Sequence, residues 1–165
     1  MYRIEPIAEQ QDDQVRAIIQ QVGAEFGAVG EGFGPGDAEV TAMSRYYRGV
    51  DRGYWVALVD GEVVGCGGVA PFDTPTVGSG LTGPICELRK LFLLPQYRGQ
   101  GIGRALTVTG LQFATDFGYR HCYLDTLSSM QAARQLYRSL GFIELDAPLP
   151  GTPHGGCDVW MLKQL

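Results

Sequence analysis

The stretch 88–106 reads LRKLFLLPQYRGQGIGRAL, and it decides more of the fold than any other part of the sequence. Its first half is apolar and strand-like and ends at Pro95. A turn follows in which glycine occupies alternate positions, Gly99, Gly101 and Gly103, and a helical pattern begins directly after it. Backbone N–H groups of such a turn, together with the unpaired N–H groups of a helix start, bind anions. The stretch therefore predicts a strand, an anion-binding turn and a helix.

Basic residues gather around this turn, although the chain as a whole is acidic. They are Arg89, Lys90, Arg98 and Arg104. The chain has 13 Lys and Arg against 18 Asp and Glu, a formal net charge of −5. This balance excludes general nucleic-acid binding, which needs a basic surface, but it permits one anionic ligand at a local site. A pyrophosphate is the ligand that the turn suits best.

Two common phosphate-binding motifs do not fit the turn. A Walker loop needs Gly-Lys-Ser or Gly-Lys-Thr, which the sequence lacks. A dinucleotide fingerprint needs Gly or Ala at its sixth position. That position is Arg104 if the motif starts at Gly99, and Leu106 if it starts at Gly101. Neither nucleotide motif is therefore present.

Hydrophobic periodicity and turn residues predict the elements around this stretch. In the N-terminal half we expect a strand at 2–7, a helix from Asp12 to about Phe26, a helix from Asp37 to about Gly49, strands at 54–59 and 62–70, and a loop at 71–84. In the C-terminal half we expect a helix from the glycine turn to about Phe117, with Ile102, Leu106, Thr109, Phe113 and Phe117 on one face, a strand at 121–126, a helix that Ser128 and Gln131 begin as a capping box, and strands at 142–145 and 157–162. Strands and helices alternate in the middle and strands pair as hairpins elsewhere, so residues 1–165 are expected to form one α/β domain with a mixed sheet.

Cysteine and histidine usage argues against metal or disulfide chemistry. The chain has 4 Cys, without a CxxC pair, and 2 His. Cys66, Cys86 and Cys122 lie in apolar runs and are expected to be buried in a reducing cytosol, whereas Cys157 follows two glycines and is the one thiol worth testing for reactivity. His121 is expected to be structural, and no metal site is expected.

The N-terminus lacks an apolar signal segment, and no apolar stretch is long enough for a membrane span. We therefore expect a cytoplasmic protein with no membrane association.

Arg98, Gly101 and Gly103 match the pattern Q/R-x-x-G-x-G/A. With this pattern the chain resembles the GNAT superfamily of acetyl-CoA-dependent N-acetyltransferases. The similarity resumes at 133–142, ARQLYRSLGF, which matches the A-x-x-L-Y-x-x-x-G-F element of the same superfamily. The resemblance implies a GNAT-like, strongly twisted mixed sheet of about 6–7 strands flanked by about 4 helices.

The resemblance also implies how acetyl-CoA binds. Two neighbouring parallel strands separate in this family, and the pantetheine arm lies between them. The backbone of Leu91, Phe92 and Leu93 would pair with that arm, and the N–H near Leu93 would polarise the thioester carbonyl. The turn would cradle the pyrophosphate. The residues implied for cofactor binding are Leu91, Phe92, Leu93, Arg98, Gly99, Gln100, Gly101, Ile102, Gly103 and Arg104.

The same resemblance identifies Tyr137 as the acid that protonates the departing CoA thiolate, since a phenol is neutral near pH 7. Glu87 and Asp125 are the candidates for the general base that deprotonates the acceptor amine. Each carboxylate interrupts an apolar strand-like run, and each has an ion pair with a nearby Arg or Lys as its alternative role. One position departs from the family. Met130 stands where many members have an Asn that contacts the pantetheine.

The implied activity is transfer of an acetyl group to a primary amine by direct attack in a ternary complex. The acceptor wall is expected from the segments 28–37 and 147–156, where acidic residues favour a small cationic amine. The residues that these segments and their border offer are Glu31, Phe33, Asp37, Asp146, Pro148, Pro150, Pro153 and His154. Dimers are common in the family, so a homodimer is compatible with the resemblance. The alternatives are a non-catalytic acyl-CoA-binding or sensing module and a nucleotide- or flavin-binding enzyme.

Overall fold

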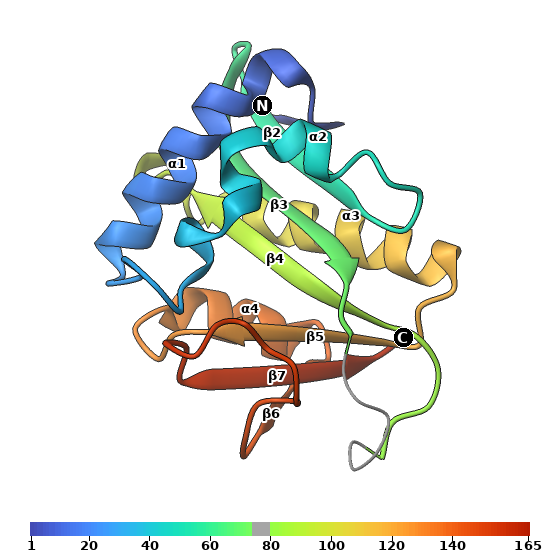
Figure 1. The fold of residues 1–165 in the computed structure, drawn as a ribbon. Helices are drawn as coiled ribbons and strands as arrows, with labels where there is room; N and C mark the ends of the chain where they lie inside the picture. Colours follow the sequence, from blue (N-terminus) through green and yellow to red (C-terminus); the bar gives the residue numbers. More distant parts are fainter. Residues whose placement is uncertain (74–79) are drawn as a thin grey trace.

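In the computed structural model, which describes residues 1–73 and 80–165, seven strands form one sheet in the order β1-β2-β3-β4-β5-β7-β6 (Figure 1). The strands are β1 Arg3–Pro6, β2 Gly53–Val59, β3 Glu62–Pro71, β4 Ile85–Leu93, β5 His121–Thr126, β6 Ile143–Leu145 and β7 Val159–Gln164. The α-helices of the described part are α1 Asp12–Glu25, α2 Met43–Tyr46, α3 Ile102–Phe117 and α4 Gln131–Ser139. Only β4 and β5 pair in parallel among these strands. The expected mixed α/β sheet is therefore confirmed.

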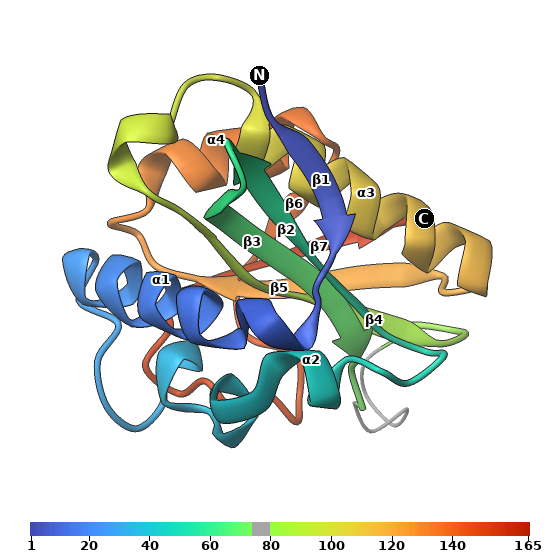
Figure 2. The same cartoon turned by 90° about the horizontal axis from the view of Figure 1, so that it is seen from above.

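The helices cover both faces of the sheet. Helices α1 and α2 lie on one face, and α3 and α4 lie on the other (Figure 2). Helix α1 buries Val15, Ile19 and Val22 at helical spacing against the sheet. Helix α3 buries Ile102 and Leu106 in the same way on the opposite face.

Phe117 is less buried than expected for the predicted face of α3, since it is 45% exposed at the last position of the helix. Its ring lies against the rings of Phe113 and Tyr119, with centroids 6.3 Å and 5.1 Å away. The helical period places it on the correct side, but the neighbouring rings cover it only in part.

Strands β4 and β5 pair at only one end. The parallel pairing joins Ile85 to His121, Cys86 to Cys122 and Glu87 to Tyr123, and it stops there. Both strands continue beyond this point, β4 to Leu93 and β5 to Thr126, without pairing with each other. The two strands therefore separate into a wedge that is open toward the turn at Gly99–Gly103.

A bulge at Lys90 changes the faces that β4 presents. Lys90 has φ +51°, and the pairing of β3 with β4 shifts between Cys66 and Gly68. In a regular strand, Arg89 and Lys90 would point to opposite faces. Here both side chains reach the α2 side, where each forms an ion pair with Glu39. The bulge therefore places two neighbouring cations on one face of the sheet.

The helix predicted from Asp37 to about Gly49 is wrong. The segment forms a short 3₁₀ turn at Ala38–Ala42 and then the single turn α2. The break falls at Ala42, which has φ −153° and ψ 65°. The carboxylate of Asp12 accepts hydrogen bonds from the N–H and the hydroxyl of Ser44, at 2.8 and 2.7 Å. A side chain from α1 thus stabilises a new helix start, which local periodicity does not reveal.

The capping box predicted at Ser128 and Gln131 is also wrong. Met130 precedes the first turn of α4, and no side chain caps that end. Ser128 instead donates its N–H and its hydroxyl to the carboxylate of Asp158, at 2.8 and 2.7 Å. The hydroxyl of Ser128 therefore links the segment before α4 to the segment before β7 by a hydrogen bond.

The remaining expectations concern the cysteines, the loop at 71–84 and membrane-spanning segments. Cys66, Cys86 and Cys122 are buried free thiols, as expected. Part of the loop expected at 71–84, residues 74–79, lies outside the described residues. In the described ranges, no helix combines the length and the apolar character that crossing a bilayer requires.

Candidate active site

A groove of about 480 Å³ lies at the open end of the wedge between β4 and β5. Its floor is the end of β4, and its sides are the start of α3 and the first turns of α4. The groove brings together most of the residues predicted for cofactor binding, namely Leu91, Phe92, Leu93, Arg98, Gly99, Gly101, Gly103 and Arg104. The side chains of the other two point elsewhere, since Gln100 is exposed and donates to the carbonyl of Gln96, and Ile102 is 1% exposed in the core. The size suits a small-molecule ligand.

The glycine turn leaves open space above its backbone. Gly99 and Gly101 have φ +74° and +85°, which is left-handed backbone that glycine adopts without strain. A Cβ at Gly99 would meet nothing within 4 Å, and one at Gly101 would meet only the Tyr2 hydroxyl at 3.9 Å. Gly101 precedes the first turn of α3, whose leading N–H groups have no intrahelical partner. The turn therefore offers an anion direct access to the backbone.

Arg98 is already bound within the chain. Its guanidinium forms two 2.7 Å bonds to the carboxylate of Glu25 and donates to the carbonyl of Leu93 at 3.0 Å. It also lies over the ring of Phe26, 5.2 Å from the centroid. The sequence pattern does not reveal Glu25, because its carboxylate comes from the end of α1. Arg98 thus joins α1 to the wall of the groove.

A second cavity adjoins the groove and shares Leu91, Phe92 and Met130 with it. This second cavity, the inner cavity, lies between β4, β5 and the segments 28–35 and 154–157. Its polar lining includes all three predicted catalytic residues together with two others: Glu87, Asp125, Tyr137, His154 and Cys157. The structure therefore brings Glu87, Asp125 and Tyr137 to a single space beside the groove.

Glu87 is a buried carboxylate with one unpaired oxygen. Glu87 is 1% exposed. Its Oε1 accepts a 2.5 Å hydrogen bond from Nε of Arg89. Oε2 is buried and has no hydrogen-bond partner among the described residues. Burial raises the pKa of Glu87 above its ordinary value, against the opposing effect of the Arg89 and His154 charges. The unpaired oxygen is thus free to hold a ligand or a proton.

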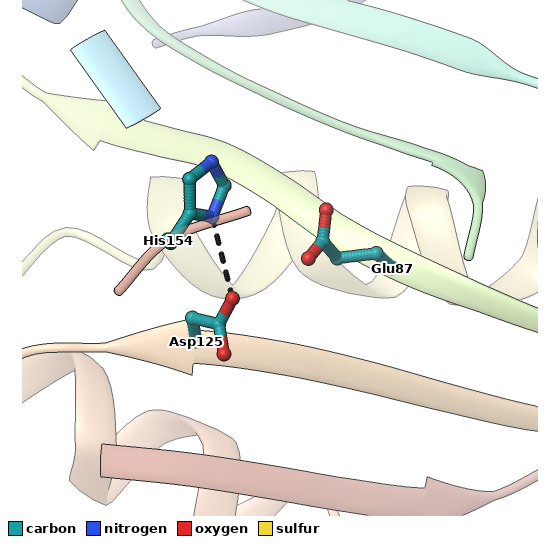
Figure 3. A group of neighbouring side chains, drawn as sticks. All are labelled: Glu87, Asp125 and His154. Atoms are coloured by element: carbon teal, nitrogen blue, oxygen red, sulfur yellow. Dashed lines mark ion pairs between the residues drawn. The ribbon is translucent and has the colours of Figure 1, made fainter. Parts of the chain in front are cut away.

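Asp125 has partners on both oxygens. The hydroxyl of Tyr123 donates to Oδ1 at 2.5 Å, and the hydroxyl of Thr152 donates to Oδ2. Nδ1 of His154 also lies 3.3 Å from Oδ2. Figure 3 shows the side chains of Glu87 and Asp125 directed toward this imidazole, with the ion pair between Asp125 and His154 dashed. Asp125 therefore positions its neighbours.

His154 lies between two carboxylates that are far away in sequence. Its Nε2 is 2.9 Å from Oδ2 of Asp37, and its Nδ1 faces Asp125. Burial lowers the pKa of His154, but the bonds to Asp125 and Asp37 outweigh that effect and raise it to about 9. The sequence places His154 only in the acceptor wall. No local pattern points to this contact, since Asp37 is 117 positions away.

Arg89 and Lys90 extend the charged cluster. Arg89 donates to Glu39 at 3.1 Å and to the hydroxyl of Tyr46 at 3.0 Å, and Nζ of Lys90 lies 2.8 Å from Asp37. The carboxylates of this described cluster are Asp37, Glu39, Glu87 and Asp125, and its cations are Arg89, Lys90 and His154. With all groups ionised, the formal sum is 3 − 4 = −1. This cluster therefore carries one more formal negative charge than positive charge.

The remaining side chains of the inner cavity are neutral. Tyr137 is 5% exposed, and its ring packs against Phe142 with centroids 5.8 Å apart. Burial raises the pKa of Tyr137, so its phenol stays protonated. Sδ of Met130 accepts from the hydroxyl of Thr126 at 3.7 Å. Burial and nearby carboxylates raise the pKa of the Cys157 thiol to about 12.

Comparison with known proteins agrees with this geometry. Residues 25–142 match the family model described as Acetyltransferase (GNAT) family. The chain is 35% identical over 157 residues to the uncharacterized N-acetyltransferase YjgM of Escherichia coli, covering 94% of this chain and 90% of that protein. A GNAT acetyltransferase from Staphylococcus aureus superposes with a TM-score of 0.81 at 18% identity, covering 100% and 99% of the two chains. The aminoglycoside N-acetyltransferase AAC(6')-Iy, in complex with CoA, superposes with a TM-score of 0.69 at 19% identity, covering 89% and 91%.

Proposed function

Because this chain belongs to the GNAT family of acetyltransferases and is an acyltransferase enzyme, we propose that it transfers an acetyl group from acetyl-CoA to a small cationic primary amine. The amine attacks the thioester directly while both substrates are bound. Acetyl-CoA occupies the groove at the open end of the wedge, with its pyrophosphate on the turn 99–104. The acceptor occupies the inner cavity, which meets the groove at Leu91, Phe92 and Met130.

The observation that carries this proposal is the unpaired Oε2 of Glu87 in the inner cavity. A buried acceptor oxygen without a donor costs free energy, so such an oxygen is retained where a ligand supplies the donor. An ammonium group is a donor with the charge that the cluster lacks. Glu87 is also a stronger base than an exposed glutamate, because burial raises the pKa of its carboxylate.

Asp125 suits the role of general base less well. Tyr123, Thr152 and His154 already occupy its oxygens, and a proton taken up there would disturb all three contacts. We assign to it the task of holding His154 in place. By contrast, Oε2 of Glu87 accepts no hydrogen bond from the described residues. The two candidates from the sequence thus take different roles, a base and a positioning residue.

Tyr137 is the proposed acid. Its phenol lines the inner cavity next to the strand ends where the thioester would lie, and its raised pKa keeps the proton available. The sulfur that leaves as a thiolate requires one proton. Direct attack therefore needs one base and one acid on opposite sides of the reacting carbon, and Glu87 on β4 and Tyr137 on α4 supply them.

The acceptor is proposed to be small and cationic for two reasons. The inner cavity is small, about 80 Å³, and Phe33, Pro35 and His154 are among the residues that line it. Its charged cluster sums to −1, which favours a monocation over an anion or a neutral amine. AAC(6')-Iy, by its name, acetylates an aminoglycoside, a polycation, so both short amines and aminoglycosides belong in the test.

The test measures the release of free CoA thiol from acetyl-CoA with a panel of polyamines, amino acids, arylamines, aminoglycosides and short peptides. Turnover with short cationic amines, lost in Glu87→Gln and in Tyr137→Phe, is the expected result. Turnover that is unchanged in both variants would overturn the roles given to these residues. Binding of acetyl-CoA with no turnover across the panel would instead favour a non-catalytic acyl-CoA-binding module.

A further inference from the structure

We propose that Glu87, Asp125 and His154 form a binding site for Zn²⁺, and that Zn²⁺ bound there excludes the acceptor amine. One carboxylate oxygen of each acid and one ring nitrogen of His154 lie within 4.8 Å of one another. Carboxylate oxygens and imidazole nitrogen are ligands that Zn²⁺ takes in proteins. This inference is independent of which amine the enzyme acetylates, and it departs from the absence of a metal site expected from the sequence.

The spacing of two ligand atoms already fits a tetrahedral zinc ion. Nδ1 of His154 and Oδ2 of Asp125 are 3.3 Å apart. Zinc at about 2.0–2.1 Å from each ligand places two tetrahedral ligands about 3.3–3.4 Å apart. A carboxylate oxygen of Glu87 lies within 4.8 Å of the other two ligand atoms, so a side-chain movement would complete a set of three, and the fourth position would hold water.

The unpaired Oε2 of Glu87 is the observation that singles out this cluster. The oxygen is buried and has no hydrogen-bond partner in residues 1–73 and 80–165. The side chain of Glu87 that carries it points toward the Asp125–His154 pair (Figure 3). A solvated group of acids would leave such an oxygen in water. Here a protein donor is missing where a cation has room to bind.

The surrounding contacts are those that hold a metal-binding histidine in place. Nε2 of His154 is 2.9 Å from the carboxylate of Asp37, so it can donate there and leave Nδ1 to the metal. The hydroxyls of Tyr123 and Thr152 orient Asp125 in the same way. Lys90 fixes Asp37 at 2.8 Å. His154 and Asp125 are therefore positioned before a metal binds.

The charge of a zinc ion also suits this cluster. Zn²⁺ with a neutral His154 replaces the charge of one imidazolium by two positive charges and brings the sum of the cluster from −1 to 0. A cationic amine would restore the same balance at the same oxygen. The metal and the amine therefore compete for Glu87, and zinc is expected to act as an inhibitor.

The experiment titrates the metal-free protein with Zn²⁺ by calorimetry and with Co²⁺ by visible absorption, in the absence of substrates. We expect one zinc per chain and the visible bands of tetrahedral Co²⁺. Glu87→Gln and His154→Asn should each weaken binding by more than about 100-fold, and Asp37→Asn by about 10–100-fold. Circular dichroism verifies that each variant is folded.

Two matched variants serve as controls. His121→Asn removes the other histidine, and Cys157→Ser alters a neighbour of His154 in the same cavity, so both should bind zinc as the unaltered protein does. Absence of stoichiometric binding, or equal binding by the Glu87 and His154 variants, would overturn the proposal. Loss of binding in Cys157→Ser would show that the ligand set is wrong. None of these readouts needs an active acceptor.

Discussion

The hydroxyl of Tyr54 donates a 2.7 Å hydrogen bond to the carbonyl of Lys90, the residue at which β4 bulges. Tyr54 is 2% exposed, so this bond is shielded from water. The bulge turns Arg89 and Lys90 to the same face, and both cations hold Glu39 there. A single contact between β2 and β4 therefore supports the charged side of the inner cavity.

Removal of this hydroxyl should cost stability and activity together. Tyr54→Phe removes a buried hydrogen-bond donor from the carbonyl of Lys90, which should lower the free energy of unfolding by about 1–3 kcal/mol in a denaturant titration. The KM for the acceptor should also rise, since the charged cluster loses its support. Tyr119→Phe is the control, because Tyr119 donates to the carbonyl of Asp51 at 2.6 Å away from the site. It should lose stability and keep its KM.

Neutralisation of the proposed base should reduce chemistry without unfolding the protein. Glu87→Gln keeps the shape of the side chain and an acceptor for Arg89, so the melting temperature should change little. General-base catalysis contributes about 10²–10⁴-fold, and kcat should fall by that order. Steady-state kinetics with an active amine checks this. A kcat equal to that of the unaltered enzyme would remove Glu87 from the mechanism.

Loss of the proposed acid, Tyr137, should slow acetyl transfer by removing the proton donor to the leaving thiolate. Tyr137→Phe keeps the ring that packs against Phe142, so the fold and the affinity for acetyl-CoA should be retained. We expect kcat to fall by about 10²-fold or more, because the CoA thiolate loses its proton donor. Calorimetric titration with acetyl-CoA separates binding from turnover. A rise in KM for acetyl-CoA at constant kcat would contradict the assigned role.

The glycines at the two ends of α3 permit a controlled test of the turn. Gly101→Ala places a Cβ at φ +85°, and Gly118→Ala places one at φ +110°. Both should lower stability by about 1–2 kcal/mol, the cost of left-handed backbone for a residue with a Cβ. Only Gly101→Ala should raise the KM for acetyl-CoA, since its Cβ projects into the space proposed for the pyrophosphate. An equal effect on KM in both variants would contradict that placement.

Cys157 should be a slow thiol despite its position in the cavity. Its pKa is raised to about 12, first by burial and then by the charges of Asp125 and Glu87. At pH 8 the reactive thiolate is then about a thousandfold scarcer than for a free cysteine. Labelling of the native protein with a disulfide reagent should therefore be slow, and its rate should rise about tenfold per pH unit. Rapid labelling at pH 8, absent in Cys157→Ser, would contradict this.

Elements that depend on neighbouring residues could be predicted from the amino-acid sequence alone. The stretch 88–106 predicted a strand, a glycine turn and a helix, and these are β4, the turn at Gly99–Gly103 and α3. The element at 133–142 placed Tyr137 on a helix. Such patterns are readable because backbone geometry and helical periodicity act over a few residues.

Contacts between distant segments could not be predicted from the sequence, because they form only in the folded chain. Asp12 accepts a hydrogen bond from Ser44 at the start of α2, and Asp158 accepts one from Ser128 before α4. For this reason the predicted helix at 37–49 and the predicted capping box at Ser128 were wrong. The bulge at Lys90 depends on a tyrosine of another strand, and Glu25 reaches Arg98 from the end of α1. His154 meets Asp37 and Asp125 only because the folded chain brings their segments together. The physical reason is that charge pairing and burial depend on distance in space, and local sequence patterns carry no information about it.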